Sequence, residues 1–201
     1  YINAYGKDAV RYFVLREVPF GSDGNFSEEA LVNRTNADLA NVLGNLVNRT
    51  IAMNKKYFDN IVVKGNDKTE FDDELINLVI STKDTVDKYM DELKVPEALD
   101  AIMEIFKRCN KYIDETTPWI LAKDENSREK LKTVIYNLLE SIRIGAILLS
   151  PFLPDTSEEI FRQLNTSINS IDTIKSFGHL VEGSKLNVPI PLFKRIEKTT
   201  E

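Results

Sequence analysis

Apolar residues recur at intervals of three and four along most of this chain, and this spacing constrains the fold more than any other feature. It is clearest over residues 128–149, where the apolar positions are Leu131, Ile135, Leu138, Leu139, Ile142, Ala146 and Leu149. Such a pattern gathers the apolar side chains on one face of an α-helix. The same reasoning predicts long helices over residues 27–58, 72–93 and 96–115. Four long amphipathic helices joined by short connections predict an all-α helical bundle.

Shorter segments flank these helices. Residues 8–17 predict a compact helix whose inward-facing side chains are Ala9, Val10, Phe13 and Val14. Ser27 is a predicted N-cap, because a hydroxyl side chain followed by acidic residues is typical of a helix start. Thr156 or Ser157 is predicted to cap a later short helix. After residue 165 the pattern is no longer helical, and we expect an extended C-terminal tail that packs back on the body of the bundle.

The charge of the chain narrows its possible partners. The formal net charge is −6, whereas a protein that coats nucleic acid without sequence preference carries a positive surface. Binding to nucleic acid would therefore need local readout or the help of a larger assembly. The chain also begins at Tyr1, without a methionine and inside a predicted helix. We therefore expect it to be part of a longer protein.

Hydropathy and cysteine content predict where in the cell the protein is located. A membrane-spanning helix needs about 20 apolar residues, but the longest apolar run, residues 142–149, is interrupted by Arg143 and Gly145. We therefore expect no membrane association. The single cysteine, Cys109, lies on a helical apolar face, and its predicted place is the core. A lone buried thiol is typical of a reducing compartment, which predicts a cytoplasmic protein.

Catalytic constellations find little support in the sequence. With His179 as the single histidine, neither a His-rich zinc site nor a Ser-His-Asp arrangement can be assembled from this chain. The glycine-containing segment 19–24 lacks the lysine and the spacing of a phosphate-binding loop. We assign no catalytic residue and no metal site.

One stretch of the predicted helix over residues 27–58 does not resemble a scaffold. Asn41, Asn45, Asn48 and Arg49 fall on the face opposite the apolar positions. Asn is a weaker helix former than the Glu, Lys and Ala of an ordinary solvated face. Amide and guanidinium groups do offer bidentate hydrogen bonds to base edges or other planar polar ligands. The alternatives are a solvated stripe without a partner, or Asn side chains that bond neighbouring helices.

Trp119 is the single tryptophan, and it follows Pro118 at a helix break instead of lying in an apolar stripe. A tryptophan at such a junction commonly fills the gap between helices. The second interpretation is a stacking platform, because single-stranded bases are held on aromatic faces worth about 1–3 kcal/mol per base.

Several motifs together resemble the methionyl-tRNA synthetase family, in the region after its active-site signature loop. They lie in order along the whole chain, at residues 5–17, 19–27, 36–49, 117–123, 149–154 and 191–196. One departure is Lys194, where the family more often has proline.

The resemblance implies a domain organisation and a set of roles. Residues 1–33 would end a stem-contact segment, 34–165 would form a helical anticodon-binding domain, and 166–201 would be the tail. The residue matching Trp119 stacks on an anticodon base, with Pro118 shaping the turn. Those matching Asn41, Asn45 and Arg49 contact anticodon bases or nearby backbone.

The partners follow from the same resemblance. They are the anticodon loop of methionine tRNA, with the anticodon CAU, and the catalytic domain of the same chain. The family's two adenylate-forming motifs and its zinc knuckle are absent from this sequence. The resemblance therefore implies no ligase activity and no cofactor for this chain alone, while the parent enzyme would use ATP and Mg²⁺.

Two other functions fit the same features. A helical protein-interaction domain could dock a partner on the same polar face. The anticodon domain of a sister synthetase for an aliphatic amino acid shares the bundle, although the set of Trp119, Asn45 and Arg49 argues against it.

Overall fold

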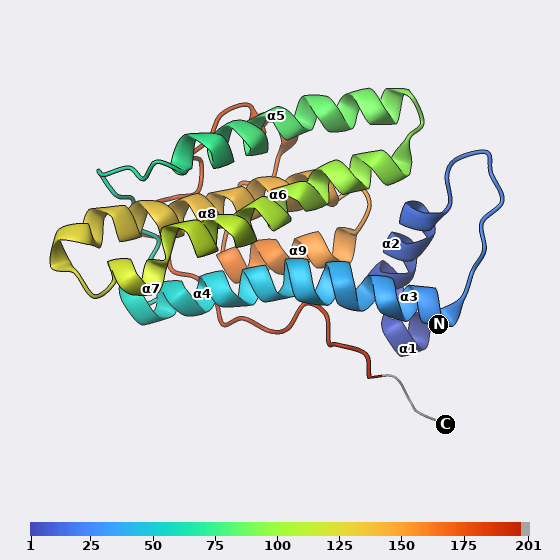
Figure 1. Ribbon diagram of the computed structural model, residues 1–201, viewed down its shortest axis with the longest axis horizontal. Coiled ribbons are helices and arrows are strands. Elements are labelled where there is room, and N and C mark those ends of the chain that lie inside the picture. Colours follow the sequence, from blue (N-terminus) through green and yellow to red (C-terminus); the bar gives the residue numbers. More distant parts are fainter. Residues whose placement is uncertain (198–201) are drawn as a thin grey trace.

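The computed structural model describes residues 1–197 as a bundle of helices (Figure 1). The elements are α1 (Ile2–Tyr5), α2 (Lys7–Glu17), α3 (Glu28–Arg34), η1 (Thr35–Gly44), α4 (Asn45–Phe58), α5 (Asp72–Asp91), α6 (Val95–Thr116), α7 (Pro118–Leu121), η2 (Glu125–Ser127), α8 (Arg128–Leu149), α9 (Pro154–Leu164) and η3 (Ile171–Ile174). No strand occurs in these residues, and one isolated bridge joins Ile61 to Lys185. The predicted all-α bundle is confirmed.

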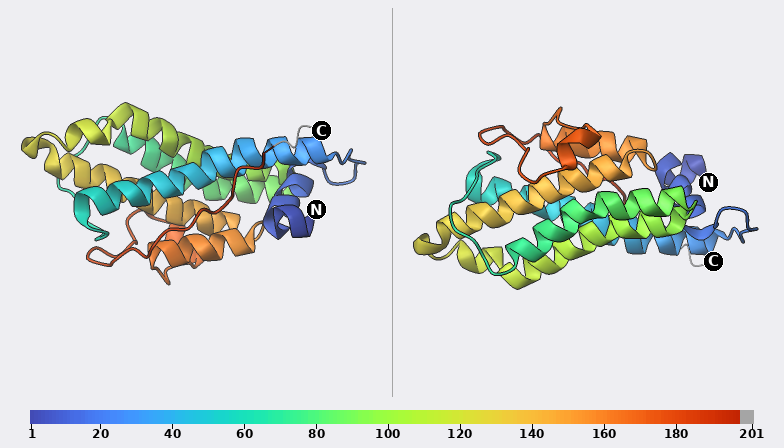
Figure 2. Two further views of the ribbon diagram at one scale, coloured as in Figure 1. Left: turned by 90° about the horizontal axis from the view of Figure 1, so that it is seen from below. Right: turned by 90° about the horizontal axis from the view of Figure 1, so that it is seen from above.

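Helix α8 is the centre of the bundle. Every residue from Val134 to Leu149 is buried, because α8 packs against α4, α5, α6 and α9. The right view of Figure 2 shows α8 flanked by α9 on one side and by α5 and α6 on the other. A helix that is apolar on nearly all sides is stable only when it is covered on all sides. The remaining helices are amphipathic and contribute one face each.

The predicted helix over residues 27–58 is continuous, but it is not α-helical throughout. Ser27 is its N-cap and accepts a hydrogen bond from the Ala30 N–H at 3.1 Å, as predicted. Its middle, η1, is a π-helix of ten residues. π-helical turns are rare in proteins, and those that do occur often lie at functional sites. The inward face is buried at Leu39, Leu43, Leu46 and Thr50.

Two details of the shorter helices differ from prediction. Val14 was expected to face inward, but 42% of it is exposed, because Tyr12 and Phe13 occupy the buried face of α2. Helix α9 begins at Pro154, so neither Thr156 nor Ser157 is its N-cap. The capping carboxylate comes from a distant residue: Asp8 accepts hydrogen bonds from the N–H and the hydroxyl of Thr156, both at 2.7 Å.

A buried ion pair holds the C-terminal segment against α8. Arg143 and Glu140 are both fully buried and lie 2.6 Å apart. Glu140 accepts hydrogen bonds from the consecutive N–H groups of residues 178–180 at 3.0–3.2 Å. Arg143 donates to the Ile168 carbonyl and to the Thr173 hydroxyl and carbonyl. These contacts satisfy both charges and place the segment that leads into the tail.

The extended tail then runs along the body as expected. Gln163 donates to the Ile190 carbonyl at 2.8 Å. The Asn36 side chain both donates to the Ile196 carbonyl and accepts from its N–H, at 2.9 and 2.8 Å. Residues 198–201, the end of the predicted tail, lie outside the described residues.

The variant Glu140→Gln tests the buried pair. It leaves the Arg143 guanidinium buried without a counter-charge, and breaking such a pair costs about 3–5 kcal/mol. We expect that loss in the free energy of unfolding measured with urea. Glu159→Gln is the matched control, because its partner Arg162 has the same spacing and the same 2.6 Å distance but is 44% exposed; surface pairs contribute about 0–1 kcal/mol. Equal losses in the two variants would contradict this description of the pair.

Candidate nucleic-acid interface

The polar residues of the long helix face outward. Asn41 lies in η1, and Asn45, Asn48 and Arg49 lie in the first turns of α4. All four are exposed. We call these four residues the polar row.

Hydrogen bonding distinguishes the polar row from the other Asn residues. Within residues 1–197, no side chain of the polar row makes a hydrogen bond or an ion pair. Other Asn side chains do bond within the fold, namely Asn36, Asn54, Asn110, Asn137, Asn165 and Asn187. The alternative that the row bonds neighbouring helices is therefore excluded for the described part of the chain. Its donors and acceptors are available to a ligand.

The turn after α6 carries the tryptophan. Thr117 has a left-handed conformation, φ 43° and ψ 66°, and ends α6. Pro118 follows as the buried first residue of α7, where a proline suits the helix start. Trp119 is 42% exposed and takes no part in the buried core. Trp119 therefore does not fill a gap between helices.

A buried network anchors the end of α6 below this turn. The Tyr112 hydroxyl donates to Asp72 of α5 and accepts from the Asn137 amide of α8 at 3.2 Å. Burial, together with the hydrogen bond to Asp72, raises the pKa of Tyr112 above its ordinary value. Tyr112 therefore stays a neutral donor. The Thr116 hydroxyl donates to the Tyr112 carbonyl at 2.7 Å, so the network extends to the last residue of α6.

Asn110 connects the helix that carries the polar row to the helix that ends at the tryptophan turn. Its side-chain amide donates to the Val42 carbonyl at 3.2 Å, which joins α6 to η1. The two helices run in the same direction (Figure 1). Seven residues separate Val42 from Arg49, and seven separate Asn110 from Thr117, about 10 Å of helix in each case. Arg49 and the tryptophan turn therefore lie on the same side of this bond, each about 10 Å of helix beyond it.

The other end of the polar row lies beside the tail. Asn41 lines a shallow pocket with Asn33, Asn36, Arg195 and Ile196, among other residues. The structure thus brings Asn45 and Arg49 toward the level of the tryptophan turn. It places Asn41 about 12 Å of helix away from Arg49, toward the end of the tail.

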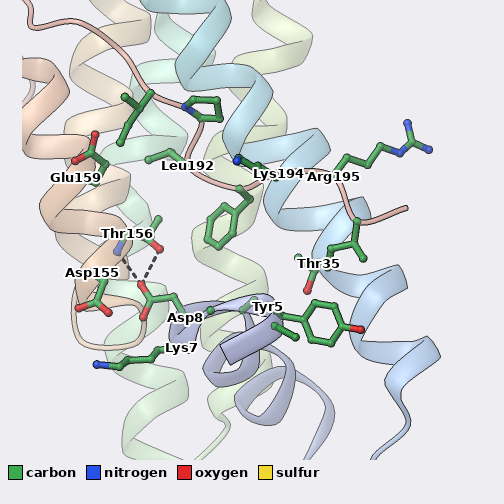
Figure 3. Close-up of a pocket in the computed structure, with 17 residues that line it drawn as sticks. Tyr5, Lys7, Asp8, Thr35, Asp155, Thr156, Glu159, Leu192, Lys194 and Arg195 are labelled. Carbon is green, nitrogen blue, oxygen red and sulfur yellow. Dashed lines mark hydrogen bonds between the residues drawn. The ribbon is translucent and has the colours of Figure 1, made fainter. Parts of the chain in front are cut away.

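A separate pocket lies elsewhere. It has a volume of about 470 Å³ and lies where the tail crosses between α9 and the N-terminal helices (Figure 3). Figure 3 shows the two hydrogen bonds from Thr156 to Asp8 on its wall. None of the predicted binding residues lines this pocket. Within residues 1–197, no group of three or more His, Cys, Asp and Glu side chains is arranged to hold a metal ion. In the same part of the chain, no helix has the length and apolar character to cross a membrane.

Two features of the interface were not predicted from sequence. The π-helix in η1 has one signal in the sequence, the weak helix formers concentrated at Asn41, Gly44 and Asn45. The bond from Asn110 to Val42 has none, because its partner is a backbone carbonyl 68 residues away.

Comparison with known proteins decides the family. A family profile described as the anticodon binding domain of methionyl tRNA ligase matches residues 62–201. The chain belongs to the methionyl-tRNA ligase family. A second profile, for the class I tRNA synthetases of the methionine type, matches residues 1–51 and includes the polar row. The resemblance drawn from the sequence motifs is confirmed.

Relatives within the family are similar over the whole chain. The chain is 51% identical to the methionine–tRNA ligase of Clostridium perfringens, over 98% of the chain and 30% of the relative. It is 47% identical to that of Bacillus subtilis, over all of the chain and 31% of the relative. The crystal structure of apo methionyl-tRNA synthetase from Mycobacterium tuberculosis matches with a TM-score of 0.91 and 35% identity, over 98% of this chain and 40% of that one. The chain therefore spans about three tenths of the length of these curated relatives.

Cys109, predicted to be a core residue, is fully buried, and desolvation raises the pKa of its thiol to about 12. Because the thiolate is the reactive form, we expect the folded protein not to react with Ellman's reagent at pH 8. Unfolding should expose one reactive thiol. Ala52→Cys, at an exposed position of α4, is the positive control. Rapid reaction of the folded wild type would show that Cys109 is accessible.

Proposed function

We propose that this chain recognises the CAU anticodon of methionine tRNA through the polar row and Trp119. In this proposal the Trp119 indole stacks on one anticodon base. Asn45 and Arg49, and at the far end Asn41, bond base edges or the adjacent backbone, while Pro118 fixes the turn that presents the indole. Sequence-specific RNA recognition targets such loops of unstacked bases by aromatic stacking and base-edge hydrogen bonds.

One observation carries the proposal. A row of amide and guanidinium groups is exposed without an intramolecular partner in the described residues, and the chain's single tryptophan is half-exposed at the end of a helix that is bonded to the helix carrying the row. An exposed stripe of Asn weakens a helix, so a scaffold alone gives no reason for it. The net charge of −6 fits local readout, with phosphate contacts supplied elsewhere in the protein.

The activity of the whole protein is part of the same proposal. Family membership supports a parent that joins methionine to tRNA with ATP and Mg²⁺ on a catalytic domain of the same chain. The residues described here would supply tRNA binding and no catalytic group. The buried free Cys109 suits a reducing compartment, and we place the protein in the cytoplasm.

The proposed division of the chain is 1–33, 34–165 and 166–201. Its first boundary falls inside the continuous helix formed by α3, η1 and α4. The stem-contact segment and the anticodon-binding domain therefore share that helix.

Docking of a protein partner on the same face is the second candidate function. It is favoured by Ile120, which lies next to Trp119 and is 56% exposed. The experiment on Trp119 separates the two functions.

Trp119→Ala should weaken binding of a CAU anticodon stem-loop more than tenfold, since stacking contributes about 1–3 kcal/mol. Circular dichroism should be unchanged, because the indole lies outside the core. Trp119→Phe should retain most of the affinity, and Ile120→Ala, the matched control, should retain all of it. Unchanged affinity in a folded Trp119→Ala protein would remove Trp119 from the site. Wild-type protein that binds no anticodon loop would favour protein docking.

Asn45→Ala and Arg49→Ala should each reduce discrimination between CAU and a loop with one changed anticodon base. In analogous readout, a bidentate hydrogen bond to a base edge contributes about 1–3 kcal/mol of discrimination, and each variant removes the groups that would form it. Asn77→Ala, at an exposed position on α5, is the control. Titrations at one fixed salt concentration measure the ratio. Equal losses for all loops would mean that these residues contact only the backbone.

A further inference from the structure

We propose that Asn110 is a positioning residue for anticodon recognition, which fixes Trp119 against the polar row. The inference rests on the proposed function and extends it to a residue that belongs neither to the polar row nor to the tryptophan turn. Its role would be to hold α6, which ends at the tryptophan turn, at one position along the helix that carries Asn45 and Arg49.

The bond falls where the long helix changes its hydrogen-bonding pattern. η1 ends at Gly44, and the N–H of Asn45 donates to both the Ala40 and the Val42 carbonyls. The Asn110 amide of α6 donates to the same Val42 carbonyl at 3.2 Å. A carbonyl oxygen has two lone pairs, so it accepts from both donors. The bond therefore ties α6 to one particular turn of the long helix, the turn that contains Val42.

No comparable bond restrains these two helices elsewhere. Among the described residues, the Asn110 bond is the only hydrogen bond between α6 and residues 30–58. The other buried side chains of these two helices, among them Leu43, Leu46 and Phe106, belong to one apolar core. Apolar burial is not directional. It holds the helices together but specifies their axial position less sharply than a directed hydrogen bond.

The position of the tryptophan turn relative to Arg49 depends on this bond. Seven residues on each helix lead from the bond to Arg49 and to Thr117. Both stretches are helical, so a shift of α6 at Asn110 is transmitted to the tryptophan turn. Binding constellations need to be held within about 0.5 Å of their productive geometry. Loss of the bond should therefore reduce the free-energy difference between binding a CAU loop and binding a changed loop by more than it reduces the free energy of unfolding.

The sharpest variant is Asn110→Asp, which keeps the shape but lacks the donor, because a carboxylate only accepts. Asn110→Ala is the second variant, and Asn110→Gln is the rescue, since it restores an amide donor. Asn165→Asp is the matched control. The Asn165 amide donates to the Lys185 carbonyl at 2.8 Å, away from α6, and Asp tolerates its left-handed conformation.

The experiment measures discrimination and the spectrum of the indole. Each full chain is titrated with a CAU stem-loop and with a loop changed at one anticodon base, at one salt concentration. We expect Asn110→Asp and Asn110→Ala to lose about tenfold in the affinity ratio of the two loops, the effect of about 1.4 kcal/mol. The emission of Trp119, the single tryptophan, should also change in these variants. Asn110→Gln should restore part of both, and Asn165→Asp should change neither.

Two results would overturn the inference while leaving the proposed function intact. One is wild-type discrimination and unchanged Trp119 emission in folded Asn110→Asp and Asn110→Ala proteins. The other is an equal loss of affinity for both loops that follows the loss of stability, because a merely structural role predicts it. Wild-type protein that does not distinguish the two loops would contradict the proposed function itself, and the inference would fail with it.

Discussion

The complete burial of α8 is the constraint on which the rest of this structure depends. From Val134 to Leu149 every residue of α8 is buried, so the neighbouring helices must cover it on every side. α4, α5, α6 and α9 each contribute one apolar face to this cover. Their opposite faces are then turned to solvent, which is why the polar row lies outside. Glu140 and Arg143 are the charged exception inside α8, and their pairing gives the C-terminal segment its place.

The surface that results has two parts, which come from different helices. One part is a continuous helical face, whose position is set by the buried Leu39, Leu43 and Leu46 beneath it. The other is a turn, produced where Thr117 stops α6 in a left-handed conformation and Pro118 begins a new helix. A recognition surface built from two elements depends on how those elements are held together. The Asn110 bond joins them directly, and the buried Tyr112 network fixes the end of α6 against α5 and α8.

Periodicity predicted the bundle because it depends on residues close in sequence. The helix over residues 128–149 was predicted to the residue, and Ser27 was identified as an N-cap because its partner is three residues away. Prediction failed at the start of α9 because the deciding contact is distant: Asp8, 148 residues away, bonds the Thr156 N–H there. It also failed within α2, where Tyr12 and Phe13, not Val14, occupy the buried face.

The candidate site shows the same division. The exposed side chains of the polar row follow from helical sidedness, while the roles of Asn45, Arg49 and Trp119 stay predictions that come from the family resemblance. The π-helix has only a weak local signal, the poor helix formers at Asn41, Gly44 and Asn45. The bond between Asn110 and Val42 joins two separate helices, and no local pattern in the sequence encodes it.

The central claim is that the polar row and Trp119 together form the RNA-binding face. The most direct test is a two-dimensional amide NMR titration of the chain with a CAU stem-loop, with side-chain amide and indole N–H signals assigned. The account predicts that the largest shifts occur at the Asn41, Asn45 and Asn48 amides, the Arg49 guanidinium and the Trp119 indole. Shifts concentrated at the pocket between α9 and the tail, with the Trp119 indole unperturbed, would contradict it.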